Sequence, residues 1–132
     1  MAHKLKYRVL PWKLAVARAA AGAEIPAWAL AGEFASVVRA PSETSFVCEE
    51  GRIPQDHEGI VIEAGWVALG LEGPFPFAMT GVLAAFIEPL ANAGISVFAM
   101  STFDTDYVLV KQENLAPTLV ALGEAGHQEL QG

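Results

Sequence analysis

ISVFAMSTFDTDYVLVKQENL, residues 95–115, contains two short segments that are rich in β-branched and aromatic residues. Residues of these types favour strands. The sequence therefore predicts strands at residues 95–102 and 106–111. The three residues between them, Phe103-Asp104-Thr105, suit the turn of a β-hairpin.

Upstream of this hairpin, GPFPFAMTGVLAAFIEPLANAG (residues 73–94) has the spacing of a helix with one buried face. The apolar residues that recur at three- and four-residue steps are Met79, Leu83, Phe86, Ile87 and Leu90. Pro89 should bend or weaken this helix, and Gly94 should end it. A short apolar strand, residues 66–71, precedes it and runs into the turn Glu72-Gly73-Pro74.

Downstream of the hairpin, Leu115, Leu119 and Leu122 share one face of a second predicted helix. Asn114 is its expected N-cap, and Pro117 is tolerated because it falls in the first turn. Residues 127–130 follow as a final edge strand. The predicted order in this half is strand, helix, strand, strand, helix, strand.

The first half of the chain repeats this order in shorter form. Residues 12–17 take the place of residues 66–71, residues 34–40 that of 95–101, and residues 45–48 that of 106–109. The segment GAEIPAWAL can supply only about two helical turns. Chance similarity is the alternative, but the shared order of elements favours duplication.

These elements predict an α+β fold of two ferredoxin-like βαββαβ units, with antiparallel sheets and helices on one face. The first unit, residues 1–63, is degenerate, and the second is residues 64–132. The two units are expected to join edge to edge into eight strands. The alternating Lys4, Lys6 and Arg8 are interpreted as the solvated face of an edge strand.

Composition narrows the function. The chain has 132 residues, 53% of them hydrophobic and 17% charged, and a net charge of −7. So few charged residues cannot cover the whole surface, and some apolar surface should be buried against a partner. A second copy of the chain is the simplest partner, which favours a homodimer. The scattered basic residues exclude nucleic acid as a partner. With no membrane span and no signal peptide pattern, we expect no membrane partner and a cytosolic protein.

Enzyme signatures are absent from the sequence. HExxH, GxSxG and P-loop motifs do not occur. The single cysteine, Cys48, lies in an apolar segment and is expected to be an inert buried thiol. The cluster Asp56-His57-Glu58 is better interpreted as a solvated loop than as a metal site. We therefore expect no catalytic residue, no metal and no cofactor.

The quoted stretches of the second half, above all STFDTDYVLV, resemble small bacterial proteins built from tandem ACT domains. They are also similar to the ACT units of eukaryotic cytosolic arginine sensors and to the regulatory end of aspartate kinases. IPAWAL, FASVVRA and PSETSFVCEEGRIP in the first half resemble a degenerate unit of the same family. The resemblance covers residues 7–130 and implies a non-catalytic module that binds an amino acid between ACT units.

Carried over by position, the resemblance implies ligand contacts before and at the start of the first helix and on the hairpin. The implied ligand-binding residues are Pro76, Met79, Thr80, Gly81, Leu83, Thr102, Phe103 and Asp106. Met79 stands where the arginine sensors have an acidic residue that contacts the ligand side chain. A neutral or apolar amino acid is therefore expected rather than a cationic one.

Simple chemistry agrees with these positions. Free N–H groups at a helix start, here residues 79–82, can hold the ligand carboxylate. Asp106 can hold the ammonium, whereas Asp104 is interpreted as a turn residue. Thr80 is equally well interpreted as a helix cap. Met79, Leu83 and Phe103 could line the side-chain pocket, although residues at helical spacing more often belong to a core.

The sequence thus predicts a homodimeric, non-catalytic ACT protein that senses or carries a small amino acid. The alternative is a regulatory or structural partner subunit with a vestigial ligand site. An enzyme that uses one of the three histidines is a third and weaker alternative.

Overall fold

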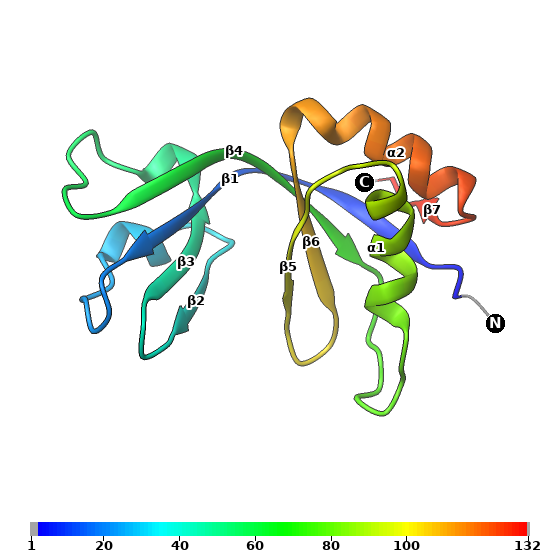
Figure 1. The fold of residues 1–132 in the computed structure, drawn as a ribbon, viewed down its shortest axis with the longest axis horizontal. Helices are drawn as coiled ribbons and strands as arrows, with labels where there is room; N and C mark the ends of the chain where they lie inside the picture. Colours follow the sequence, from blue (N-terminus) through cyan, green and yellow to red (C-terminus); the bar gives the residue numbers. More distant parts are fainter. Residues whose placement is uncertain (1–2, 132) are drawn as a thin grey trace. The chain divides into compact units, whose positions relative to one another are not determined.

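The computed structural model describes residues 3–131 (Figure 1). The elements follow in the order β1 (Lys6–Ala19), η1 (Ala27–Leu30), β2 (Ser36–Arg39), β3 (Thr44–Glu49), η2 (Glu50–Arg52), β4 (Val61–Leu71), α1 (Val82–Asn92), β5 (Phe98–Ser101), β6 (Asp106–Lys111), η3 (Gln112–Asn114), α2 (Leu115–Glu124) and β7 (Gln128–Glu129). The elements η1, η2 and η3 are short 3-10 helices. The predicted α+β class is confirmed.

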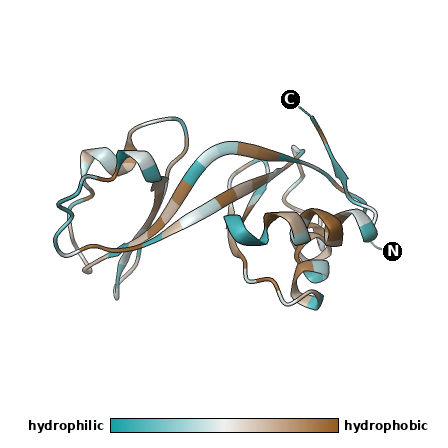
Figure 2. Ribbon diagram, turned by 90° about the horizontal axis from the view of Figure 1, so that it is seen from above, coloured by the Kyte–Doolittle hydropathy of each residue, from teal (hydrophilic) through white to brown (hydrophobic). Residues whose placement is uncertain are grey.

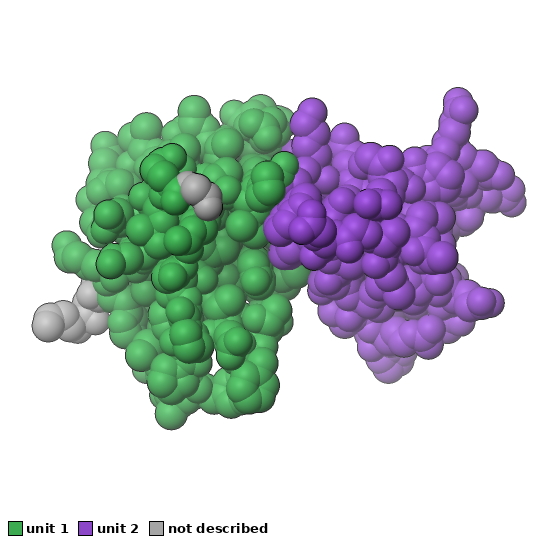
Figure 3. Space-filling view, turned by 180° about the vertical axis from the view of Figure 1, so that it is seen from behind, with its two compact units in different colours: residues 1–11, 67–132 green, residues 12–66 purple. Residues whose placement is uncertain are grey.

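The chain forms two compact units, coloured separately in Figure 3. Unit 1 comprises residues 1–11 and 67–132, and unit 2 comprises residues 12–66. Strands β1 and β4 each run from one unit into the other. The expected boundary after residue 63 falls inside β4, and the structure assigns residues 1–11 to the same unit as the second half of the chain.

The hairpin of unit 1 forms where the sequence predicts it. Strands β5 and β6 are antiparallel, with Phe98 opposite Leu109 and Ser101 opposite Asp106. The Thr102 N–H donates to the Thr105 carbonyl at 2.8 Å and closes the turn. Strand β5 is shorter than predicted, because it starts at Phe98 rather than at residue 95.

Helix α1 starts later than its apolar spacing suggests. Gly81 is its N-cap, in the left-handed conformation with φ 80°, which a glycine adopts without steric cost. Met79 therefore lies in the preceding loop and not on the helix. The buried face of α1 consists of Val82, Phe86 and Leu90, and in Figure 2 the helices carry both hydrophobic and hydrophilic segments.

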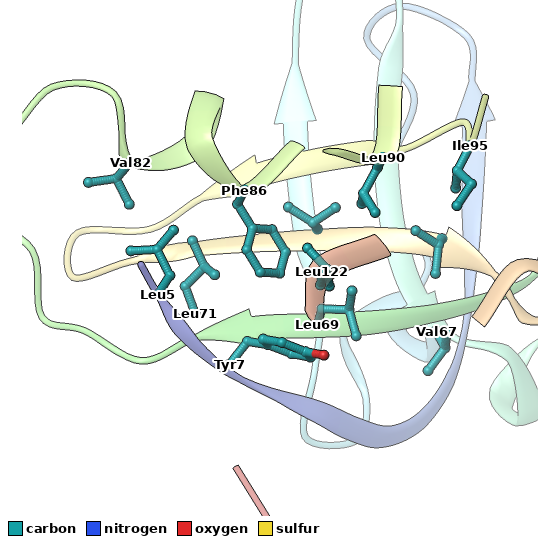
Figure 4. Close-up of a cluster of buried hydrophobic side chains, with 12 residues drawn as sticks. Leu5, Tyr7, Val67, Leu69, Leu71, Val82, Phe86, Leu90, Ile95 and Leu122 are labelled. Atoms are coloured by element: carbon teal, nitrogen blue, oxygen red, sulfur yellow. The ribbon is translucent and has the colours of Figure 1, made fainter. Parts of the chain in front are cut away.

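The core of unit 1 lies between its helices and one face of its strands. Residues Val67, Leu69 and Leu71 alternate along β4, so they point to the same face, and they cluster with residues of β6, α1 and α2. Figure 4 shows Phe86 of α1 pointing toward this face. Its ring meets Tyr7 of β1 edge-on, with 5.4 Å between the ring centroids. The predicted placement of both helices on one face is confirmed.

Unit 2 repeats the element order with 3-10 turns in place of helices. Its strand order, β2-β3-β1-β4, is that of a ferredoxin-like sheet. Instead of the two turns predicted for GAEIPAWAL, only Ala27–Leu30 is helical. The core is small, with Ala15, Ala17, Ala29, Phe46 and Cys48 as its buried members. The predicted degeneracy of this unit is confirmed and goes further than expected.

Three details of the strands differ from these expectations. Seven strands occur among residues 3–131 instead of eight, because β1 and β4 serve both units. Strand β7 pairs in parallel with β1, at Lys6 and Tyr7, so the sheet is not wholly antiparallel. For the same reason the segment with Lys4, Lys6 and Arg8 is not an edge, since β1 pairs with β4 as well as with β7.

Candidate functional site

Unit 1 carries an open hollow of about 210 Å³ between the loop that precedes α1 and the β5–β6 hairpin. The loop contributes one wall and the hairpin the other. The lining residues are Phe75, Pro76, Phe77, Met79, Val82, Ser101, Thr102, Phe103, Asp104, Thr105 and Asp106.

Two hydrogen bonds connect the hairpin to the loop and to the end of β4 that precedes it. The Phe75 N–H donates to the Asp104 carbonyl at 2.8 Å, and the Thr105 hydroxyl donates to the Leu71 carbonyl at 2.9 Å. Gly73 permits this close approach, because a Cβ atom there would lie 2.8 Å from the Asp104 carbonyl oxygen. The two walls are thus fixed relative to each other.

Two phenylalanines stand exposed at the rim. The residues Phe77 and Phe103 are 75% and 78% exposed, and their rings meet edge-on with 4.7 Å between centroids. Met79 is also exposed beside them. Exposed aromatic side chains gathered at a hollow are typical of binding surfaces.

The polar side of the hollow is acidic. The hydroxyl of Ser101 donates to the carboxylate of Asp106, which pairs with it across the hairpin. Asp104 also lines the hollow, whereas its lining contains no lysine or arginine. A positively charged group such as an ammonium therefore suits this wall better than an anion does.

The structure brings five of the eight predicted contact residues together. Pro76, Met79, Thr102, Phe103 and Asp106 line the one hollow. They come from the loop and from the hairpin, the two segments that the resemblance indicated.

The other three predicted residues, Thr80, Gly81 and Leu83, are not in this lining. Thr80 is not a helix cap either, because Gly81 takes that position without a side-chain cap bond. Instead, the Thr80 carbonyl accepts a hydrogen bond from His3 Nε2 at 2.9 Å. Gly81 sets the start of α1, and Leu83 packs against the core.

Sequence reasoning missed half of the wall. Phe75 and Phe77 were not singled out, although the alternating GPFPF before the helix was a usable signal. Asp104 is interpreted above as a turn residue. It does lie in the turn of the hairpin, where its carbonyl accepts the Phe75 N–H, but it also lines the hollow. Ser101 was missed because its role depends on the strand pairing with Asp106.

The remaining candidates lie elsewhere. Cys48 is buried, as expected, and burial together with Glu49 and Glu50 raises the pKa of its thiol to about 11. In the loop at Asp56, the His57 ring bonds the Pro54 carbonyl and the Glu58 N–H donates to Asp56. These are local turn contacts.

Among residues 3–131, no group of three or more His, Cys, Asp or Glu side chains is arranged to hold a metal ion. No helix in this part of the chain has the length and apolar character to cross a membrane.

Comparisons with known proteins agree with this geometry. The family profile described as ACT domain matches residues 61–124, and a profile for an N-terminal domain matches residues 13–56. The cytosolic arginine sensor for mTORC1 subunit 1 of Bos taurus is 32% identical over 98 residues, which is 68% of this chain and 30% of that protein. The chain spans 30% to 57% of the length of the curated relatives it matches first.

Solved structures extend the similarity to the whole chain. A protein of Agobacterium tumefaciens is 40% identical, with a TM-score of 0.89 over 98% of this chain and 94% of that one. The regulatory subunit of aspartate kinase from Thermus thermophilus shares the fold at 13% identity, with a TM-score of 0.63 over 94% and 97% of the two chains. The chain therefore belongs to the ACT-domain family.

Proposed function

We propose that this protein is a non-catalytic regulatory protein of the cytoplasm that binds a free amino acid in the hollow of unit 1. The main support for this proposal is that the acidic residues Asp104 and Asp106 line one small hollow together with exposed apolar side chains. Relatives named as an arginine sensor and as a regulatory subunit support a sensing role.

The two ends of an amino acid would meet different groups. Asp106 receives the ammonium, because one of its oxygens already accepts the Ser101 hydroxyl and the carboxylate is thereby oriented. Val82 lines the hollow and is the first residue of α1. The first N–H groups of a helix have no acceptor within the helix, so they suit the ligand carboxylate.

The side chain of the ligand would lie against Met79, Phe77 and Phe103. Their apolar surface favours a neutral or apolar amino acid, in keeping with Met79 at the position where arginine sensors are acidic. Because the hollow is open, we propose that a second copy of the chain covers it in a homodimer.

The test is a thermal-shift screen against the twenty amino acids at neutral pH. We expect a saturable rise in melting temperature with one class of neutral amino acid, and no rise with aspartate or glutamate because the lining is acidic. A rise with arginine and lysine alone would retain the site but overturn the neutral ligand.

Asp106→Asn supplies the matched variant. It keeps the shape of the side chain and an acceptor for the Ser101 hydroxyl but removes the charge. The ligand concentration that gives half of the full shift should therefore rise by about tenfold or more. Asp56→Asn, in an exposed loop of unit 2, is the control and should respond as the wild type does. An unchanged response of Asp106→Asn removes that residue from the site.

The alternative is a regulatory partner subunit with a vestigial ligand site. The exposed Phe77–Phe103 pair favours it, because an aromatic pair at the surface suits a protein partner as well as a ligand. This alternative would be supported if none of the twenty amino acids shifted the melting temperature and a larger protein co-purified with the chain only when Phe77 and Phe103 were intact.

A further inference from the structure

A second hollow adjoins the first one at the loop that precedes α1. It has a volume of about 300 Å³, and its lining residues are Pro74, Phe75, Pro76, Phe77, Phe103 and Asp104. All of these except Pro74 also line the hollow of about 210 Å³ described above. The two hollows therefore share a wall, and a ligand bound in the first has the second directly beside it.

The two hollows differ in their chemistry. Ser101, Thr102, Thr105 and Asp106 line the first hollow, and none of them lines the second. Five of the six residues that line the second are proline or phenylalanine. Such a surface favours the burial of apolar groups and offers few polar side chains as partners. The sixth residue, Asp104, is exposed to solvent, so an ion pair with its carboxylate would contribute little to binding.

The shape of the second hollow is set by the backbone of the loop. Pro74 and Pro76 each have a φ angle that their ring fixes at about −65°. The Met79 N–H donates to the Pro76 carbonyl at 3.0 Å, and the Phe75 N–H donates to the Asp104 carbonyl at 2.8 Å. The backbone is thus held on both sides of Phe77. A preformed wall loses little conformational entropy when an apolar group binds to it, which favours affinity.

The volumes of the hollows indicate that they act together. Sites for small molecules usually have a volume of about 300–1,000 Å³. The first hollow, at about 210 Å³, lies below this range, and with the second hollow, at about 300 Å³, the site comes within it. The first hollow therefore suits the two charged ends that all amino acids share, and the second supplies room for a large side chain.

We propose that the second hollow is a side-chain subsite, which makes the protein selective for amino acids with large apolar side chains. The inference rests on the proposed function, in which Asp106 holds the ligand ammonium in the first hollow. Phe77 and Phe103 line both hollows, so a side chain that follows their rings leaves the first hollow and enters the second. The methyl group of alanine is too short to do so and gains nothing from the second hollow.

The first experiment is a thermal-shift titration of the full chain with alanine, 2-aminobutyrate, norvaline and norleucine. These amino acids differ by one methylene group at each step. Each methylene buried in the second hollow should lower the ligand concentration at half of the full shift by about fourfold. Lysine is norleucine with an ammonium on its last carbon, and it should require a higher concentration than norleucine because that charge loses its water.

The outcomes of this titration separate the subsite from the proposed function. Equal half-shift concentrations for alanine and norleucine would overturn the subsite and leave the amino-acid site intact. Tighter binding of lysine than of norleucine would overturn the apolar character of the subsite. The absence of a shift with any amino acid would overturn the proposed function, and the subsite with it.

Variants test which residues form the subsite. Phe77→Ala removes a wall of the second hollow at a residue that is 75% exposed. It should raise the half-shift concentration of norleucine by about tenfold and that of alanine by about twofold or less. Phe103→Ala should give the same pattern and serves as the second variant. Equal losses for the two ligands in both variants would overturn the subsite.

Two controls complete the design. Asp106 lines only the first hollow, so Asp106→Asn should weaken alanine and norleucine by the same factor and leave their ratio unchanged. Val120 is an exposed apolar residue of α2 that lines neither hollow. Val120→Ala should therefore bind both ligands as the wild type does. A change of the alanine-to-norleucine ratio in Asp106→Asn as large as that in Phe77→Ala would contradict the division of the site into two parts.

Discussion

Unit 1 and unit 2 have the same order of elements but use different means to cover their strands. Unit 1 has two α-helices of 11 and 10 residues, whereas unit 2 has 3-10 turns of 4 and 3 residues in the same places. Two of the buried members of the core of unit 2 are alanines of β1, and a third is Ala29 of η1. Small side chains let a short turn lie close to the strands, so the strand order persists where the helices do not.

The units also differ in what their carboxylates do. In unit 2 the Glu49 carboxylate accepts hydrogen bonds from the N–H groups of Glu33 and Phe34, and Glu50 accepts one from Gly65 at 2.9 Å. In unit 1 the loop is held by a backbone bond, from Phe75 to Asp104. In unit 2 the carboxylates of Glu49 and Glu50 thus bind backbone N–H groups of the same unit, whereas in unit 1 Asp104 and Asp106 line a hollow.

The largest effect should come from the cores. Phe86 is fully buried among large side chains, so Phe86→Ala should lower the free energy of unfolding by about 3–5 kcal/mol. Phe46→Ala in unit 2 should cost less, because alanines around it lose fewer contacts. Urea denaturation measures both. An equal or larger loss for Phe46→Ala would break the comparison.

The next effect is a backbone effect in unit 2. Gly65 lies inside β4 with φ 85°, so Gly65→Ala should cost about 1–2 kcal/mol through left-handed strain. Gly51→Ala is the matched control: a Cβ atom meets nothing within 4 Å at either glycine, and only Gly65 has a positive φ. Equal stabilities of the two variants would show that the strand relaxes around Gly65.

A smaller effect, of opposite sign, is expected in α2 of unit 1. Thr118 is fully buried, and its hydroxyl has no hydrogen-bond partner among residues 3–131. Thr118→Val replaces the hydroxyl with a methyl group of similar size, and should stabilise the protein by about 1 kcal/mol. Thr118→Ser keeps the hydroxyl and should destabilise it. The prediction is wrong if Thr118→Val lowers the melting temperature.

The last prediction concerns the pH dependence of stability in unit 2. Backbone hydrogen bonds from Glu33 and then Phe34 lower the pKa of the Glu49 carboxyl. A lowered pKa in the folded state means that Glu49 stabilises unit 2 above the ordinary glutamate pKa, and that this contribution is lost as the pH falls. NMR titration should show Glu49 titrating below the ordinary glutamate pKa. The difference between wild type and Glu49→Gln should shrink toward low pH, and a constant difference would contradict it.

Most of unit 1 could be predicted from the sequence because its signals are local. The helical spacing of Phe86 and Leu90 and the strand composition around the Asp104 turn each fix an element by themselves. The start of α1 was placed too early because Met79 fits the spacing. The left-handed conformation of Gly81 that ends the loop there is not visible in hydrophobic periodicity.

What escaped prediction depends on contacts between distant residues. Strand β1 belongs to both units, and in unit 1 it pairs with β7, where Tyr7 lies opposite Glu129. No local sequence pattern indicates this pairing. Half of the wall of the hollow was missed for the same reason, because Phe77 joins it by meeting Phe103. The resemblance gave the segments of the site, and the tertiary contacts selected the residues within them.

The passage of β1 through both units has a consequence for how the protein is made. Unit 2 is one continuous stretch, residues 12–66, so all of its residues are available for folding as soon as that stretch has left the ribosome. Unit 1 needs residues 1–11, which are synthesised before unit 2, and residues 67–132, which are synthesised after it. Leu5 and Tyr7 in the first of these segments therefore stay uncovered until the segment that follows unit 2 has been made.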